Sequence, residues 1–236
     1  MGQTFDVAII GGGIAGFSLA HYLGANRKVL ILEQEDAFGY HATARSAAEF
    51  AFRFHTPLVG KLAALSFPFL NNPPQDFSAV QLLRERGMIL IASEEKRARL
   101  DEVLATESAK TDRLRRFSRD EVLAAAPILN PDFFASAFFD PDCWDIEADA
   151  LFQGFRKSAS ANGTVAISKA RVASAERKSG YWQIDTHSGQ FEAAVVVNAS
   201  GAWADQTAVL FGAAPLAHAP LNRTMITVDI PVGIDW

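Results

Sequence analysis

Three glycines near the start of the chain could bring bare backbone against an anionic group. Gly11, Gly13 and Gly16 fit the spacing G-x-G-x-x-G, after an apolar run and before residues with helical spacing. In that context the first glycine permits a tight turn, the second lets the main chain approach a pyrophosphate, and the third lets a helix pack closely on a strand. The first N–H groups of the helix then offer donors and a partial positive charge to the diphosphate. The spacing therefore predicts a dinucleotide site.

Glu33 adds a second chemical group to this site, because it ends the next apolar run. An acidic side chain there can accept hydrogen bonds from both ribose hydroxyls and would exclude a 2′-phosphate. The pattern serves FAD and NAD alike. Two features favour FAD: residues 41–50, HATARSAAEF, are too small and polar for a core strand, and residues 198–203, NASGAW, end a strand in small residues. An NAD-binding dehydrogenase module remains the alternative.

The elements that must position these residues follow the order of an α/β fold. A strand over 5–10, a helix over 14–24 and a strand over 28–32 form one βαβ unit, whose crossover makes the two strands parallel. Further helices are expected at 57–70, 94–106, 147–161 and up to 211, and further strands at 87–93, 133–139, 165–168, 172–177, 181–186, 191–198 and 224–230. The connector KSG, at 178–180, and the turn HSGQ, at 187–190, suggest hairpins. We predict an α/β fold, with a parallel Rossmann-like sheet and an antiparallel insertion.

Composition limits the class of protein. The chain has 236 residues, of which 49% are hydrophobic and 21% charged, as in globular proteins of one or two domains. A net charge of -5 argues against a nucleic-acid partner. The single cysteine, Cys143, excludes an intrachain disulfide and argues against a cysteine-based metal site, and we expect no metal. Neither a signal peptide nor an apolar run of about 20 residues is recognisable, so we expect a cytoplasmic protein without a transmembrane segment.

Several segments resemble the FAD-dependent D-amino-acid oxidase and dehydrogenase superfamily, most closely its bacterial D-arginine dehydrogenase-like branch. They are GGGIAG, LILE, GYHATARSAAEF, LNNPP, DIEADALFQGF and VVVNASGAWAD, which occur in the family's order across essentially the whole chain. The resemblance implies FAD as the cofactor and a glutathione-reductase-like FAD-binding domain, assigned to 1–80 and 145–212. It also implies a mostly antiparallel substrate domain, assigned to 81–144 and 213–236. Relatives continue well beyond Trp236, so we expect that domain to be partial, with a C-terminal partner segment or a truncation as the two explanations.

The resemblance also assigns residues to the cofactor. Those expected at the diphosphate and the adenosine are Gly11, Gly13, Ile14, Ala15, Gly16, Glu33, Gln34 and, through its backbone, Val172. Those expected at the flavin end or beside the cofactor are Thr43, Arg45, Ser46, Ala47, Ala199, Ser200, Gly201 and Trp203. The family's STGRSAA stands here as ATARSAA, so Ala44 replaces a glycine, and the loop fits differently if that position needs a positive φ.

The implied reaction is oxidation of an amine or D-amino acid by hydride transfer from the substrate Cα to flavin N5. Oxygen or a quinone would then accept the electrons. The substrate side departs from the arginine-oxidising members, which have a histidine, a tyrosine and a glutamate where this chain has Glu49, Phe54 and Gly87. An adjacent arginine pair becomes Asn222 and Arg223. Because a missing charged ligand weakens transition-state binding, we do not expect arginine to be the substrate.

The catalytic candidates are therefore few. Glu49 could meet a cationic group or act as a base, and Arg223 could hold a substrate carboxylate. Arg53 and His55 are further candidates for substrate contact. The alternative to an amine oxidoreductase is a non-catalytic FAD-binding fragment or subunit that needs a C-terminal partner.

Overall fold

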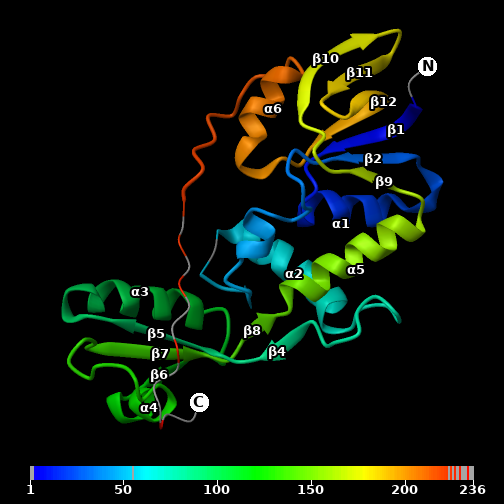
Figure 1. Ribbon diagram of the computed structural model, residues 1–236. Coiled ribbons are helices and arrows are strands. Elements are labelled where there is room, and N and C mark those ends of the chain that lie inside the picture. Colours follow the sequence, from blue (N-terminus) through cyan, green and yellow to red (C-terminus); the bar gives the residue numbers. More distant parts are fainter. Residues whose placement is uncertain are drawn as a thin grey trace. The chain divides into compact units, whose positions relative to one another are not determined.

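The computed structural model describes residues 3–54, 56–222, 224, 226, 229 and 233 (Figure 1). The chain forms two compact units. Unit 1 is Met1–Ala47, Pro74–Leu82 and Glu147–Met225, and unit 2 is Ala48–Pro73, Leu83–Ile146 and Ile226–Trp236. The largest difference from the domain bounds expected from the sequence is the stretch 48–73, which falls in unit 2.

Unit 1 is built on a six-stranded sheet with the order β10-β11-β12-β1-β2-β9. Its strands are β1 (Gln3–Ile10), β2 (Val29–Leu32), β9 (Val165–Ile167), β10 (Val172–Lys178), β11 (Tyr181–Thr186) and β12 (Gly189–Asn198). β1 pairs in parallel with both β2 and β12, and β10, β11 and β12 pair antiparallel. The predicted α/β fold with a parallel sheet and an antiparallel addition is confirmed.

The hairpins predicted at KSG (178–180) and HSGQ (187–190) are confirmed, because β10 and β11 pair antiparallel across the first and β11 and β12 across the second. β9, the first strand of the stretch 165–198, belongs to neither hairpin. This strand pairs in parallel with β2, at the edge of the sheet. The reason is the helix that precedes it, α5 (Ala148–Ala161), because a strand entered through a crossover helix runs parallel to its neighbour.

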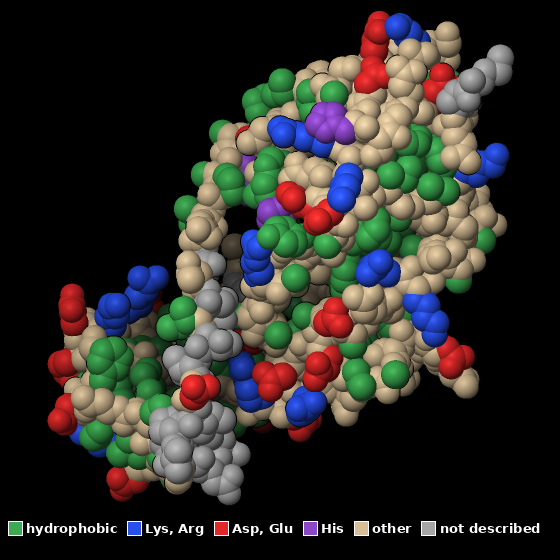
Figure 2. All heavy atoms as spheres, in the orientation of Figure 1, with side chains coloured by type: hydrophobic (Ala, Val, Ile, Leu, Met, Phe, Trp, Pro, Cys, Tyr) green, Lys and Arg blue, Asp and Glu red, His purple; other side chains and the backbone are tan. Residues whose placement is uncertain are grey.

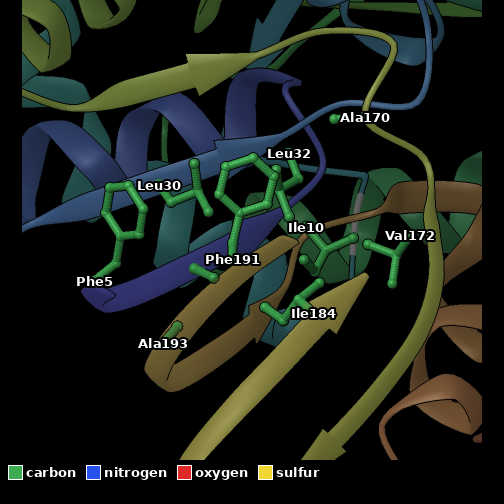
Figure 3. Close-up of a cluster of buried hydrophobic side chains, with 10 residues drawn as sticks. Phe5, Ile10, Leu30, Leu32, Ala170, Val172, Ile184, Phe191 and Ala193 are labelled. Atoms are coloured by element: carbon green, nitrogen blue, oxygen red, sulfur yellow. The ribbon is translucent and has the colours of Figure 1, made fainter. Parts of the chain in front are cut away.

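A hydrophobic core cluster packs around this sheet (Figure 3). It includes side chains from five of the strands and from the loop before β10: Phe5, Ala8, Ile10, Leu30, Leu32, Ala170, Val172, Ile184, Phe191 and Ala193. Burial of a large aliphatic or aromatic side chain contributes about 1.5–3 kcal/mol. The strand ends that surround the glycine turn are therefore fixed by packing.

Among the described residues, three helices of unit 1 form on predicted segments. α1 (Ile14–Leu23) begins after Gly13, and α5 contacts it along its length (Figure 1). The buried face of α5 shows helical spacing, with Leu151, Phe152, Phe155 and Ala159. α5 ends at Ala161 with Asn162 as its C-cap residue, and Gly163 has a φ of +81°, as predicted for this Asn-Gly pair. A short third helix, α6 (Ala204–Leu210), follows β12.

Unit 2 contains two three-stranded sheets whose described pairs are all antiparallel. The first has the order β3 (Glu49–Ala51), β8 (Cys143–Ile146), β4 (Leu83–Glu85), and the second β5 (Met88–Ala92), β7 (Ser136–Asp140), β6 (Arg115–Phe117). Its helices are α2 (Pro57–Asn71), α3 (Arg97–Ser108) and α4 (Arg119–Ala125). The expected elements near 57–70, 87–93, 94–106 and 133–139 are present, whereas the sequence does not predict β3, β4, β6, β8 or α4.

Aromatic packing joins the stretch 48–73 to unit 2. The rings of Phe50, Phe52, Phe67 and Trp144 contact one another with centroid separations of 5.0–6.1 Å. These residues belong to β3 and the loop after it, to α2 and to β8. Each such pair contributes about 0.5–1.5 kcal/mol beyond its buried area.

The remaining expectations concern the surface and the end of the chain. Among the described residues, no helix has both the length and the apolar character to cross a membrane. Figure 2 shows acidic and basic side chains interspersed over the face it presents. The strand expected at 224–230 lies mostly outside the described residues.

Candidate functional site

A cavity of about 700 Å³ opens in unit 1 where β1, β2 and β12 end. Because these neighbouring strands are parallel, their carboxyl ends meet at one edge of the sheet, which is where α/β sheets bind ligands. Twelve of the residues predicted to hold a cofactor line it: Gly11, Gly13, Ile14, Ala15, Glu33, Gln34, Thr43, Val172, Ala199, Ser200, Gly201 and Trp203. Gly16, Arg45, Ser46 and Ala47 are not among its lining residues.

Two of the motif glycines allow close backbone contacts. Gly11 has a φ of +117°, and a Cβ there would lie 2.3 Å from the carbonyl oxygen of Ala199. A Cβ on Gly16 would lie 2.1 Å from the carbonyl oxygen of Gly11. Gly16 therefore acts behind the cavity, by letting α1 pack against the turn, as the motif predicts.

The start of α1 forms the floor of the cavity. Gly13 is the N-cap residue, and no side chain caps the helix from that position. The Ile14 N–H donates instead to Thr43 Oγ1 at 3.0 Å. Thr43 thus lies at the helix start, where the diphosphate is expected, and its own hydroxyl hydrogen remains available to a ligand. A Cβ on Gly13 would lie 3.1 Å from the same Oγ1 atom.

Glu33 presents a buried carboxylate to the cavity. Its exposed fraction is 9%, and its Oε2 accepts the Gly12 N–H at 2.8 Å while its Oε1 accepts the Glu35 N–H at 2.9 Å. A carboxylate has about four lone-pair positions, so each oxygen can accept one further bond. The two amides fix its orientation, and the free positions suit ribose hydroxyls.

Sequence reasoning missed another part of the wall. Tyr40, His41, Arg171, His187 and Gln206 also line the cavity. The segment GYHATARSAAEF contains the first two, so its full length, and not only the part from Thr43 onward, could have been assigned to the site. Arg171 and His187 adjoin predicted elements, but no motif marks them.

The loop residues next to Thr43 make contacts of their own. Arg45 lies with its guanidinium carbon 4.8 Å from the centre of the Tyr40 ring. Ala44 lies in a short 3-10 helix, Ala42–Arg45, and does not have a positive φ. The loss of the family glycine at Ala44 therefore causes no backbone strain here.

The catalytic candidate Glu49 has a charged partner in unit 2. Arg86 donates from Nη2 to Glu49 Oε2 at 2.8 Å, and its Nη1 lies 3.0 Å from Asp145 Oδ1. Glu49 and Asp145 are directly opposite on β3 and β8, where two like charges would repel. Arg86 offsets that repulsion. Burial raises the pKa of the nearby Cys143 thiol, so it is a poor nucleophile.

Arg53 forms ion pairs with two buried carboxylates. Its Nη1 donates to Asp140 Oδ1 and its Nη2 to Asp142 Oδ2, each at 2.5 Å. The three side chains are only 12%, 0% and 6% exposed, so this cluster serves the fold of unit 2 and leaves Arg53 poorly placed to hold a substrate. His55 and Arg223 lie outside the described residues.

The unit 1 cavity fits a dinucleotide in its donor set and in its volume. It combines helix-start amides and the Thr43 hydroxyl for a diphosphate, a buried carboxylate for a ribose, and a wall of small residues after β12. FAD would be held by these groups.

Comparison with known proteins agrees with this chemistry. The chain is 26% identical over 245 residues to a glycine oxidase of Geobacillus kaustophilus (strain HTA426), covering 99% of this chain and 64% of that protein. It is 27% identical over 272 residues to FAD-dependent oxidoreductase domain-containing protein 1 of Bos taurus, covering 96% and 53%. The chain thus spans between about half and two thirds of these relatives.

Solved structures show the same fold. The crystal structure of glycine oxidase from Geobacillus kaustophilus superposes with a TM-score of 0.79 at 26% identity, covering 89% of this chain and 59% of that one. An L-alpha-glycerophosphate oxidase from Mycoplasma pneumoniae with FAD bound gives a TM-score of 0.77 at 19% identity, covering 88% and 57%, which shows the fold alone. The family model described as FAD dependent oxidoreductase matches residues 6–234. The chain therefore belongs to the FAD dependent oxidoreductase family, as its glycine motif and GYHATARSAAEF segment suggest.

Proposed function

We propose that the unit 1 cavity binds FAD and that the chain is part of an oxidoreductase that oxidises the amine-bearing carbon of an amino acid or another small amine. The observation that carries the proposal is the cavity at the ends of three parallel strands, with the start of α1 on one side and the Glu33 carboxylate on another. Membership of the family makes FAD, rather than NAD, the dinucleotide to test first.

Different residues of the cavity would bind different parts of the cofactor. The amides that follow Gly13 and the Thr43 hydroxyl would bind the diphosphate, and Glu33 would bind the adenosine ribose. The backbone near Val172 would contact the adenine, and Ser200 and Trp203 would lie toward the flavin. FAD, when bound, supplies the hydride acceptor, and the protein supplies binding, orientation and exclusion of water.

The names of the relatives support a choice of the first substrates to test. Glycine oxidases and amino-acid oxidases recur among them, so a small amino acid is the first substrate class to test, with D-amino acids and secondary amines next. Arginine remains an unexpected substrate, because Gly87 offers no carboxylate and Glu49 is paired with Arg86. Glu49 and Arg223 stay predictions as catalytic residues.

The experiment is reconstitution of the purified chain with FAD. We expect a yellow protein whose flavin absorbance is lost on anaerobic addition of glycine or a D-amino acid and returns with oxygen or a quinone. Gly13→Val should abolish retention of the flavin, because its side chain enters both the Thr43 contact and the diphosphate position. A wild-type protein that retains no flavin, or a Gly13→Val protein that retains all of it, would refute the site.

A second candidate function is FAD binding without turnover by this chain alone. It is favoured by the fraction of its relatives that the chain spans, 53% of the bovine protein and 64% of the Geobacillus glycine oxidase. A bound flavin that no amine bleaches would support it. In that case, addition of the remaining portion of a relative as a separate polypeptide should restore bleaching.

A further inference from the structure

His41 lines the cofactor cavity, yet neither its sequence motif nor the reaction assigns it a role. It lies two residues before Thr43, which contacts the start of α1. Its side chain is 34% exposed, and part of that exposure is toward the cavity. The imidazole therefore belongs to the cavity wall near the start of α1, where the polar middle of a dinucleotide would lie.

The ring is held from one side by Glu35. His41 Nε2 lies 2.9 Å from Glu35 Oε1. A carboxylate can only accept, so Nε2 carries the proton and donates. Glu35 is in turn fixed by its own N–H, which donates to Glu33 Oε1 at 2.9 Å. His41 is thereby connected to the carboxylate expected to bind the ribose.

The ring is held from the other side by Trp203. The two ring centroids are 4.5 Å apart, with an interplanar angle of 52°. Tyr40 adds an edge-on contact at 5.0 Å. His41 thus connects the loop after β2 with the turn after β12, and its orientation is set before a ligand arrives. A group ordered in advance loses little entropy when it binds.

The second ring nitrogen of His41 has no partner within the described residues. Nε2 is used by Glu35, and Nδ1 makes no hydrogen bond to any described residue. An imidazole nitrogen in this state can accept from a hydroxyl or, when protonated, donate to a phosphate oxygen. Both groups are present in the central part of FAD.

We propose that His41 is a further cofactor-binding residue, which uses Nδ1 to bind a polar group in the central, ribityl-to-ribose part of FAD while Glu35 and Trp203 fix its ring. This inference rests on the proposed FAD site. It goes beyond it by naming a residue that no motif marks and the atom through which it acts.

The test uses substitutions that keep different parts of the imidazole. In His41→Asn the amide can replace Nδ1, and in His41→Gln it can replace Nε2, whereas His41→Phe keeps only the ring against Trp203. Loss of one such bond should weaken FAD affinity by about three- to tenfold. We expect that loss for His41→Gln and His41→Phe, and an affinity nearer to wild type for His41→Asn. FAD dissociation constants would be measured by quenching of flavin fluorescence on titration with apoprotein.

Thermal unfolding of each apoprotein separates binding from folding. His218→Gln is the matched control, because His218 is exposed and lies outside the cavity lining. Equal FAD affinity in wild type, His41→Gln and His41→Phe would overturn the inference, as would an equal loss in His41→Asn and His41→Gln. If wild type itself fails to bind FAD, the proposed site falls and this inference with it, a result distinct from binding that is insensitive to His41.

Discussion

Replacing Glu33 by glutamine changes one carboxylate oxygen into an amide nitrogen while leaving the side-chain volume nearly the same. In the wild-type protein both oxygens accept a backbone N–H, from Gly12 at 2.8 Å and from Glu35 at 2.9 Å. In Glu33→Gln at least one of these amides faces an NH₂ group that cannot accept. Because Glu33 is 9% exposed, water does not readily replace the lost acceptor.

The magnitude follows from those two bonds. A hydrogen bond to a charged group contributes about 1.5–3 kcal/mol, and one such bond is lost while the other becomes neutral. We therefore expect Glu33→Gln to lower the unfolding free energy of the apoprotein by about 2–3 kcal/mol, or its Tm by roughly 5–10 °C. The residue should thus stabilise the glycine turn before any cofactor binds, in addition to its proposed role at the ribose.

Urea unfolding of the apoprotein measures this effect, and titration with FAD measures the second role. Glu176→Gln is the control on the same sheet: that residue pairs with Lys178 at the surface, where an exposed ion pair contributes about 0–1 kcal/mol. An apoprotein Glu33→Gln as stable as wild type would refute the claim that Glu33 orders the turn. Unchanged FAD affinity would separately remove Glu33 from the ribose.

Three further predictions concern packing and charge. Gly16→Ala should destabilise the apoprotein and weaken FAD binding, because its Cβ would lie 2.1 Å from the Gly11 carbonyl oxygen; urea unfolding and FAD titration that match wild type would contradict it. Burial lowers the pKa of His21 below its ordinary value of 6.5, so the neutral form stabilises the fold and stability should fall as pH falls through the range below 6.5. Tm measured from pH 5 to 8 should therefore change less in His21→Gln than in wild type, and identical profiles would count against this role. Arg53→Met should lower the free energy of unfolding by about 3 kcal/mol or more, since it leaves the buried Asp140 carboxylate without its charged partner, and a near-neutral result in urea unfolding would contradict this prediction.

Much of unit 1 could be predicted from the sequence because its determinants are local. The strand, glycine turn, helix and second strand between residues 5 and 32 each carry their own pattern, and a crossover allows only one relative strand direction. The hairpin turn at Lys178–Gly180 is likewise local: Ser179 and Gly180 both have positive φ values, as a tight hairpin requires. Residues that follow these strands could then be placed at a common edge without coordinates.

Unit 2 was harder to predict because its strands are short and depend on distant partners. β3 and β4 have three residues each, too few to show an alternating pattern, and both are defined by pairing with β8, some 60 to 95 residues away in sequence. The ion pair of Glu49 is hard to predict for a similar reason, because its partner Arg86 is 37 residues away in sequence. Sequence reasoning could offer Glu49 as a candidate base, whereas its partner Arg86 is recognised only when β3, β8 and β4 are aligned.

The wall of the unit 1 cavity shows how a site can be ordered by contacts that no motif encodes. The glycine spacing places an amide-rich turn, but Glu33 fixes that turn through the Gly12 N–H, and the Glu35 amide fixes Glu33 in return. His41 then joins Glu35 to Trp203, which belongs to a turn more than 160 residues away. Each link is a single hydrogen bond or ring contact, so each is weak alone. Because these contacts are connected in series from the turn to Trp203, we expect a change at His41 to alter the position of the Glu33 carboxylate. Double substitutions at Glu35 and His41 should then be less than additive in FAD affinity. Strictly additive losses of FAD affinity would mean that Glu35 and His41 act on the cofactor independently.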